Sequence, residues 1–123
     1  MNTIKQTQPV VIAKSPMLRE SARKIRTTVK TIAEMTPKEA IAALQFFPNR
    51  PAASLGKTIK QALANATNNL KLSETALSGM NIQVEEGSMM KRFRIGGRGQ
   101  VKPIHKKTSR IIVKLYTKGE SRK

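Results

Sequence analysis

The sequence predicts a chain that combines helices and strands, with three helices in its middle and a long β-hairpin in its C-terminal third. Three observations lead to this expectation. Apolar residues recur at helical spacing within residues 21–68. Apolar and polar residues alternate over residues 80–85, and residues 109–117 are rich in β-branched side chains. Between those two strand-like segments lie three glycines, Gly96, Gly97 and Gly99.

The size and composition of the chain restrict its function. Its 123 residues suit one domain. Lysine and arginine number 24 against seven glutamates and no aspartate, which gives a net charge of +17. The absence of cysteine and the single histidine, His105, exclude disulfide frameworks, Cys-ligated zinc and a Ser-His-Asp triad. No apolar run approaches the roughly 20 residues of a membrane helix. We therefore expect an intracellular, strongly basic binding protein with a polyanionic partner.

Each of the three helices has its own start signal. The first is predicted after Ser21, whose hydroxyl is expected to accept a hydrogen bond from a free backbone N–H. The second begins at residues 36–39, Thr-Pro-Lys-Glu, where the threonine caps, the proline fits the first helical position and the glutamate completes a capping box. The third is expected from about residue 51 to residue 68, after two prolines interrupt the helical pattern.

The two strand-like segments predict a hairpin that is longer than the rest of the domain is wide. Arms of some 15 residues reach roughly 40 to 50 Å, whereas a 100-residue domain has a radius of gyration near 13 Å. The outer arms must therefore project, and because an isolated ribbon is marginal in water, we infer that a partner orders it. Residues 12–19 could add an edge strand, limited by Pro16.

These elements suggest how the chain is divided. We expect residues 1–11 to be a flexible tail, residues 12–119 to be a single domain and residues 120–123 to be a C-terminal tail. Within the domain, the globular part is assigned to residues 12–86 and 109–117, and the extended hairpin to residues 87–108.

The positive charge is concentrated at two places in the sequence. Ten lysines and arginines lie between Gly87 and Gly119 without an acidic residue among them. Six more lie between Lys14 and Lys30, with only Glu20 against them. Residues 31–86 contain five basic and five acidic residues. The sequence thus indicates a neutral globular middle between two basic surfaces.

Several short motifs occur in an order and spacing that identify a family. They are Ser21-Ala22-Arg23-Lys24-Ile25-Arg26, Ala62-Leu63-Ala64-Asn65-Ala66, Val84-Glu85-Glu86-Gly87, Met90-Lys91-Arg92-Phe93-Arg94, Arg98-Gly99, Pro103-Ile104 and Lys106-Lys107-Thr108-Ser109. With these motifs the chain resembles the universal family number twenty-two of large-ribosomal-subunit proteins, in its bacterial type. The resemblance runs from about residue 12 to residue 116, and its specificity comes from the combination, since any one motif alone is weak.

The resemblance implies a fold and a place of action. The fold is α+β, with three helices packed on a small antiparallel sheet and one long protruding β-hairpin. The implied function is that of a structural constituent of the large ribosomal subunit, which binds large-subunit ribosomal RNA and supports early assembly, and whose hairpin tip lines the nascent-peptide exit tunnel. The implied partners are that RNA, neighbouring ribosomal proteins and the nascent peptide. The protein would be a monomer in the cytoplasmic ribosome, with a plastid ribosome left open, and neither an enzyme nor a binder of cofactors or metals.

The chain departs from the family pattern at the hairpin tip. Ile95-Gly96-Gly97 stands where proline-arginine-alanine is usual, Gln100 where an arginine is frequent, and Arg110 where a histidine is usual. Because glycine tolerates a positive φ, we expect Gly96 and Gly97 to loosen the turn.

The resemblance and the charge together give two sets of candidate RNA-binding residues. In the hairpin they are Met90, Lys91, Arg92, Phe93, Arg94, Gly96, Gly97, Arg98, Gly99, Lys102, His105, Lys106, Lys107 and Arg110. On the N-terminal face they are Lys14, Arg19, Arg23, Lys24, Arg26 and Lys30. The hairpin arginines are expected to fork onto phosphates or stack on bases. Phe93 could stack on a base or pack on the opposite arm, and His105 is expected to make a plain polar or phosphate contact.

Other functions were weighed from the same residues. The alternative is another basic nucleic-acid-binding protein, either a nucleoid protein or a DNA binder whose helix-turn-helix is the helix pair broken at residues 47–51, although the third helix carries few cations. An enzyme would need a general base or metal-binding carboxylates, and the candidates Glu85 and Glu86 face opposite sides of a strand. A membrane-surface peptide would need an amphipathic basic helix, whereas the basic segment here is strand-like.

Overall fold

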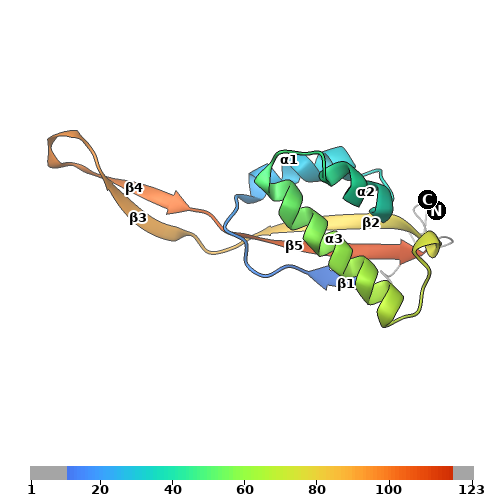
Figure 1. The fold of residues 1–123 in the computed structure, drawn as a ribbon. Helices are drawn as coiled ribbons and strands as arrows, with labels where there is room; N and C mark the ends of the chain where they lie inside the picture. The colour runs from blue at the N-terminus through green and yellow to red at the C-terminus, as the bar shows by residue number, and fades with distance from the viewer. Residues whose placement is uncertain (1–10, 118–123) are drawn as a thin grey trace, which may run out of the picture.

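A computed structural model of the chain describes residues 11–117, so most of the expected N-terminal tail and all of the C-terminal one lie outside the described residues. The elements follow in the order β1 (Val11–Lys14), α1 (Ala22–Ile32), α2 (Pro37–Leu44), α3 (Arg50–Asn68), η1 (Glu74–Ala76), β2 (Leu77–Glu86), β3 (Met90–Ile95), η2 (Gly97–Gly99), β4 (Val101–Lys106) and β5 (Ser109–Thr117). The predicted α+β class is confirmed. Figure 1 shows a body of helices on a sheet, with a hairpin projecting from one end.

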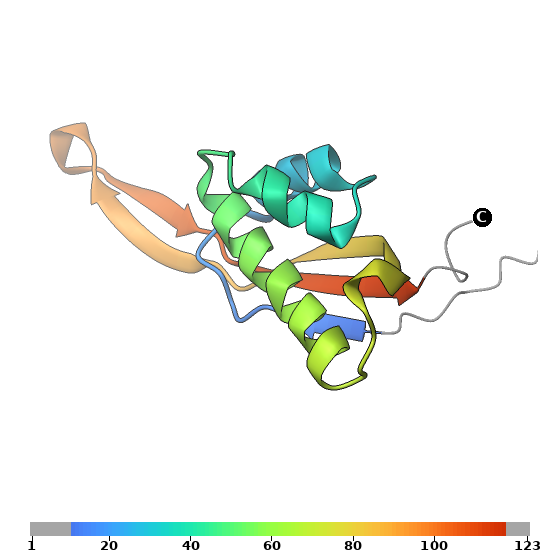
Figure 2. The same ribbon diagram turned by 45° about the vertical axis from the view of Figure 1, so that its right-hand side comes forward.

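The sheet of the body has three antiparallel strands in the order β1-β5-β2. Its central strand, β5, pairs with β1 on one side and with β2 on the other. The long helix α3 lies against β1 and β5, while α1 and α2 lie against β2 (Figures 1 and 2). The edge strand predicted within residues 12–19 is shorter than that segment, since β1 ends at Lys14.

The core lies between the sheet and the three helices. Its cluster takes side chains from the sheet and from all three helices, and Ile25, Leu55 and Ile111 are fully buried within it. The apolar positions of α3 supply its largest helical share, because seven residues of that helix are buried at helical spacing. Burial of a side chain as large as isoleucine contributes about 1.5–3 kcal/mol, so this layer is what holds the body together.

The helix starts confirm one capping prediction and correct another. Thr36 accepts a hydrogen bond from the backbone N–H of Glu39, and the Glu39 carboxylate accepts one from the N–H of Thr36, which is the predicted capping box. Ser21 does occupy the N-cap position of α1, but its side chain makes no capping hydrogen bond. The expectation for its hydroxyl is therefore wrong, and the first turn of α1 keeps free N–H groups.

The projecting hairpin is the pair β3–β4, a separate two-stranded sheet in which Met90 lies opposite Lys106 and Ile95 opposite Val101. Its turn was mispredicted in detail. The left-handed conformations fall at Arg98, with φ 60°, and at Gly99, with φ 70°, and not at Gly96 or Gly97. The reason is the closing hydrogen bond from the Gly96 N–H to the Gln100 carbonyl, which holds Gly96 extended with φ −93° and moves the reversal two residues on.

The root of the hairpin is tightly packed where it joins the body. The Gly87 N–H donates to the Thr108 carbonyl at 2.9 Å, and Leu18 and Ser109 exchange two backbone hydrogen bonds just below it. A Cβ on Gly87 would lie 2.5 Å from both Met17 Sδ and Thr108 Oγ1. Only glycine fits here without displacing a neighbouring side chain.

We expect Gly87→Ala to destabilise the body by about 1–3 kcal/mol, because the added methyl overpacks the root against the buried Thr108. The matched control is Gly56→Ala in α3, where a Cβ would meet nothing within 4 Å and where the change should stabilise by about 0.5–1 kcal/mol. Urea unfolding measures the change in the free energy of unfolding of each variant, which should be negative for Gly87→Ala and positive for Gly56→Ala. Equal stability of the two variants would contradict this account of the root.

We also expect the body to fold without the hairpin, because no residue of β3, η2 or β4 belongs to the core cluster. Deleting residues 90–106 leaves three residues between Gly87 and Thr108, enough for a short hairpin loop. The variant should unfold cooperatively, with a midpoint within a few degrees of the parent's. Loss of cooperativity in a calorimetric scan would show that the hairpin supports the body.

Candidate nucleic-acid interface

The strand register divides the hairpin into two chemically different faces. Residues directly opposite one another in an antiparallel pair project from the same side of the ribbon. One face therefore carries Met90, Arg92, Arg94, Lys102, Ile104 and Lys106, and the other carries Lys91, Phe93, Ile95, Val101, Pro103 and His105. The first is rich in cations, and we call it the cationic face. The second presents a row of apolar side chains between Lys91 and His105, and we call it the apolar face.

The apolar face is open to solvent. Phe93 is 76% exposed, Ile95 84% and Val101 59%. Phe93 lies opposite Pro103, yet packing on the other arm leaves most of its ring uncovered. Three large apolar side chains in a row on a thin ribbon form a surface that a partner can cover.

Within the described part of the chain, the hairpin cations form no ion pair with an acidic side chain. Within residues 11–117 the ion pairs are Arg26 with Glu86, at 3.6 Å, and Arg50 with Glu20, at 3.4 Å, and both lie outside the hairpin. Arg92 donates only to the carbonyl of Lys91. The charges of the ribbon are thus left for an external anion, which is what a polyanion-binding element requires.

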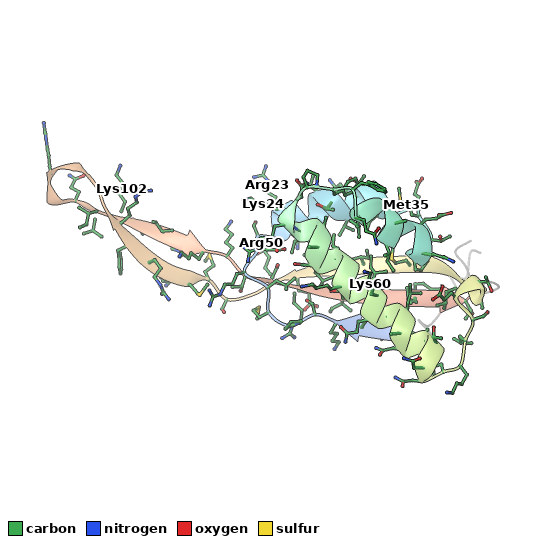
Figure 3. All side chains as sticks on the ribbon, in the orientation of Figure 1. Arg23, Lys24, Met35, Arg50, Lys60 and Lys102 are labelled. Atoms are coloured by element: carbon green, nitrogen blue, oxygen red, sulfur yellow. The ribbon has the colours of Figure 1, made fainter. Side chains whose placement is uncertain are left out.

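The fold brings part of the N-terminal basic cluster against the root of the hairpin. An open pocket of about 520 Å³ lies between them, lined by Arg19, Ser21, Lys24, Arg50, Met90, Arg92, His105, Lys106 and Lys107. No acidic side chain lines it. Figure 3 shows Arg23, Lys24 and Arg50 at the end of the body from which the hairpin leaves. We call this pocket the root pocket.

Other predicted residues do not join the root pocket. Arg26 is held on the body, where it pairs with Glu86 and donates to the Val84 carbonyl at 2.9 Å. Arg98 and Lys102 belong to the distal half of the hairpin (Figure 3 for Lys102). The remaining predicted side chains that do not line it are exposed or half-buried and lie elsewhere on the hairpin, α1, β1 and β5: Lys14, Arg23, Lys30, Lys91, Phe93, Arg94 and Arg110. The predicted site residues are therefore spread from the body to the hairpin tip, and a single pocket does not hold them.

Arg50 is the cation of the root pocket that the sequence analysis does not predict. It lies in the electrically neutral middle of the chain, so charge counting gave no reason to select it. Its place at the start of α3, after Asn49, brings it beside Arg19 and Lys24, which are more than twenty residues away in sequence. Only the packing of α3 against α1 reveals this neighbourhood.

Glu20 is a buried carboxylate beside these cations. Its side chain is 8% exposed, and Oε1 accepts a hydrogen bond from Ser54 Oγ at 3.1 Å while lying 3.4 Å from Arg50 Nε. Oε2 is buried and has no hydrogen-bond partner within the described chain. An unsatisfied buried acceptor costs about 1–3 kcal/mol, so Glu20 is a poor choice for stability alone.

The structure offers little for other chemistries. Among residues 11–117 no three His or acidic side chains gather to hold a metal ion. No helix in the same range is long and apolar enough to cross a membrane. As for a helix-turn-helix, α3 buries one face against the sheet and the other helices, and its exposed cations are Arg50 at its first position and Lys57 and Lys60 further along.

Comparison with known proteins agrees with this architecture. The family model described as "Ribosomal protein L22p/L17e" matches residues 13–116. A relative from Pediococcus pentosaceus, "Large ribosomal subunit protein uL22", is 39% identical over 88% of this chain and 92% of its own length. "Large ribosomal subunit protein uL22c" of Aneura mirabilis is 37% identical over 87% of this chain and 82% of its own. The uL22 protein of Lactobacillus gasseri is 35% identical over 88% and 92%. The resemblance inferred from the sequence motifs is therefore confirmed, and this chain belongs to the ribosomal protein L22p/L17e family.

Proposed function

We propose that this chain binds large-subunit ribosomal RNA through its hairpin and the adjoining end of its body, that it joins the subunit early in assembly, and that its hairpin tip lines the nascent-peptide tunnel. As a member of its family the chain is a structural constituent of the large ribosomal subunit and not an enzyme. The proposal concerns how its surfaces serve that role.

The observation that carries the proposal is the unmatched charge of the projecting ribbon. The hairpin is a thin pair of strands that stands away from the body, and an isolated ribbon of this kind is only marginally stable in water. Within residues 11–117 its cations meet no carboxylate that would offset their mutual repulsion. A folded polyanion would supply negative charges to pair with these cations and a surface that packs against the ribbon. Each cation that meets a phosphate releases condensed counterions and adds about 0.7 to 0.9 to the slope of log affinity against log salt.

The two faces of the ribbon suit two parts of a folded RNA. The cationic face, with Arg92, Arg94 and Lys102, fits the phosphate backbone, where arginine can fork onto two oxygens. The apolar face offers the exposed ring of Phe93 to an unstacked base, and aromatic stacking is worth about 1–3 kcal/mol per base. Because the deep groove of A-form RNA hides its base edges, recognition would be through shape and backbone.

The N-terminal face extends the contact onto the body. Arg19 and Lys24 line the root pocket with hairpin residues, so one stretch of RNA that passes there touches both parts of the protein. Lys14, Arg23 and Lys30 are exposed nearby on β1 and α1. If the hairpin and the body also hold different RNA segments, the protein brings those segments together, and this is the physical basis for the proposed role in assembly.

The tip is the part of the protein proposed to reach the tunnel. Residues 97–101 are all exposed, and the exposed apolar residues beside the turn, Ile95 and Val101, can meet a passing peptide. In this arrangement the chain acts as one copy per subunit beside neighbouring ribosomal proteins. We expect the protein to act in a ribosome, either in the cytoplasm or in a plastid.

Removing single hairpin arginines should weaken RNA binding and flatten its salt dependence. We expect Arg92→Ala and Arg98→Ala each to lower affinity for a large-subunit ribosomal RNA transcript about three- to tenfold at low salt, and to reduce the salt slope by about one contact. The matched control is Lys60→Ala, which removes the same charge from the exposed side of α3. Filter binding over a salt series measures both quantities. Slopes unchanged in both arginine variants would remove the hairpin from the interface.

The tip can be tested in translating ribosomes. A photoreactive residue in place of Arg98 should crosslink to a stalled nascent peptide, because that side chain lies in the exposed turn. The same residue in place of Lys60, on the body, should not. Crosslinks to RNA alone from both positions would contradict the tunnel assignment while leaving the RNA-binding proposal standing.

A further inference from the structure

Arg50 forms an ion pair with Glu20 beside the root pocket, which both Arg50 and Arg19 line. Its Nε lies 3.4 Å from Glu20 Oε1, while its side chain is 77% exposed. The contact with Nε uses the inner edge of the guanidinium. Within residues 11–117 no acceptor meets its two terminal nitrogens, and these form the edge of an arginine that forks onto a phosphate.

Glu20 is itself fixed from behind. Ser54, one helical turn after Arg50 on α3, donates to the same Oε1 at 3.1 Å. The carboxylate therefore spans the first turn of α3 and is almost fully enclosed. One carboxylate oxygen of Glu20 accepts a hydrogen bond, while the other is buried without a hydrogen-bond partner in the described chain. Because such a group costs stability, its contribution to the fold does not explain its presence.

The surroundings of this pair are cationic and open. The root pocket adjoins a second open pocket, of about 530 Å³, and Arg19, Ser21, Lys24 and Arg50 line both. Glu20 lines the second pocket. Arg50 thus borders both pockets together with Arg19 and Lys24, and within residues 11–117 its acidic partner is Glu20.

We propose that Arg50, oriented by Glu20, binds one backbone phosphate of RNA where the body meets the hairpin root, with Glu20 as its positioning residue. The inference rests on the proposed RNA-binding function and deepens it. An oriented guanidinium loses less conformational freedom on binding than a free one, so the carboxylate improves affinity although it is itself negative. Arg19 and Lys24 complete the phosphate's surroundings.

If Glu20 acted only through its negative charge, it would weaken RNA binding, whereas the proposed positioning role means that it strengthens binding. A negative group among cations repels a polyanion, so replacing it with neutral glutamine should tighten RNA binding if it acted only through its charge. If it orients Arg50, the same replacement should weaken binding. The sign of the change separates the two roles without any fine measurement.

The experiment is filter binding of the full chain to a large-subunit ribosomal RNA transcript. We expect Glu20→Gln to lose about fivefold in affinity, since a charge-assisted contact becomes a neutral one. The matched control is Glu34→Gln, an exposed glutamate beyond the end of α1, which should bind equally or slightly more tightly. Thermal unfolding of each variant checks that the body is intact.

Two further variants show whether Glu20 acts through Arg50. In an Arg50→Gln background, adding Glu20→Gln should cause no further loss, because there is no guanidinium left to orient. Arg50→Lys keeps the charge but loses the oriented fork, and should bind about as weakly as Glu20→Gln. Because Arg50 is largely exposed, this last variant keeps the test available if Glu20→Gln unfolds.

The outcomes distinguish this inference from the function on which it rests. If the wild-type chain binds the transcript and Glu20→Gln binds as well or better, or if Arg50→Lys is unchanged, the positioning role is wrong and the proposed function stands. If the wild type does not bind the transcript in preference to duplex DNA, both fail. Weaker binding of both variants, with non-additive losses in the double variant, supports the pair as a phosphate anchor.

Discussion

The pairing of β2 with β5 is the constraint on which the rest of this structure depends. Over the body this ladder carries the side chains that α1, α2 and α3 cover, and at Gly87 and Thr108 it passes directly into the hairpin. The ribbon is a separate two-stranded sheet, but it leaves the body directly from the ends of β2 and β5 and needs no separate domain to support it. Its register also decides which side chains share a face, because a shift of one residue would exchange cations for apolar groups along the whole hairpin.

The distribution of charge matches the division of the chain into a core-forming body and a projecting hairpin. The core-forming middle is neutral, so burial there meets no electrostatic opposition. The cations lie on the hairpin and on the end of the body beside it, where their mutual repulsion is tolerated because no core has to form among them. Glu20 is the exception in this region: its carboxylate lies 3.4 Å from Arg50 Nε, and we propose that it orients this cation as well as neutralising it.

Local signals in the sequence were sufficient for some elements and not for others. The capping box at Thr36 and the strand from Ser109 to Thr117 depend on near neighbours and were predicted correctly. The reversal at Arg98 depends on a hydrogen bond that closes the turn across the two arms, and the root pocket depends on α3 packing beside α1, so neither is written in any short stretch. Arg50 was missed for this reason. The alternation of residues along each arm is consistent with two different faces, but only the register tells which residues of the two arms share a face.

The sheet joins parts of the chain that a ribosome makes at different times. The Ser15 N–H donates to the Ile111 carbonyl, and the Ser15 hydroxyl accepts from the Ile111 N–H, across 96 positions of sequence. Since β5 follows both β1 and β2 in the chain, these two strands remain without their shared neighbour until β5 has been synthesised. The three helices can form during that interval, yet the sheet can close only afterwards, through long-range contacts that form slowly.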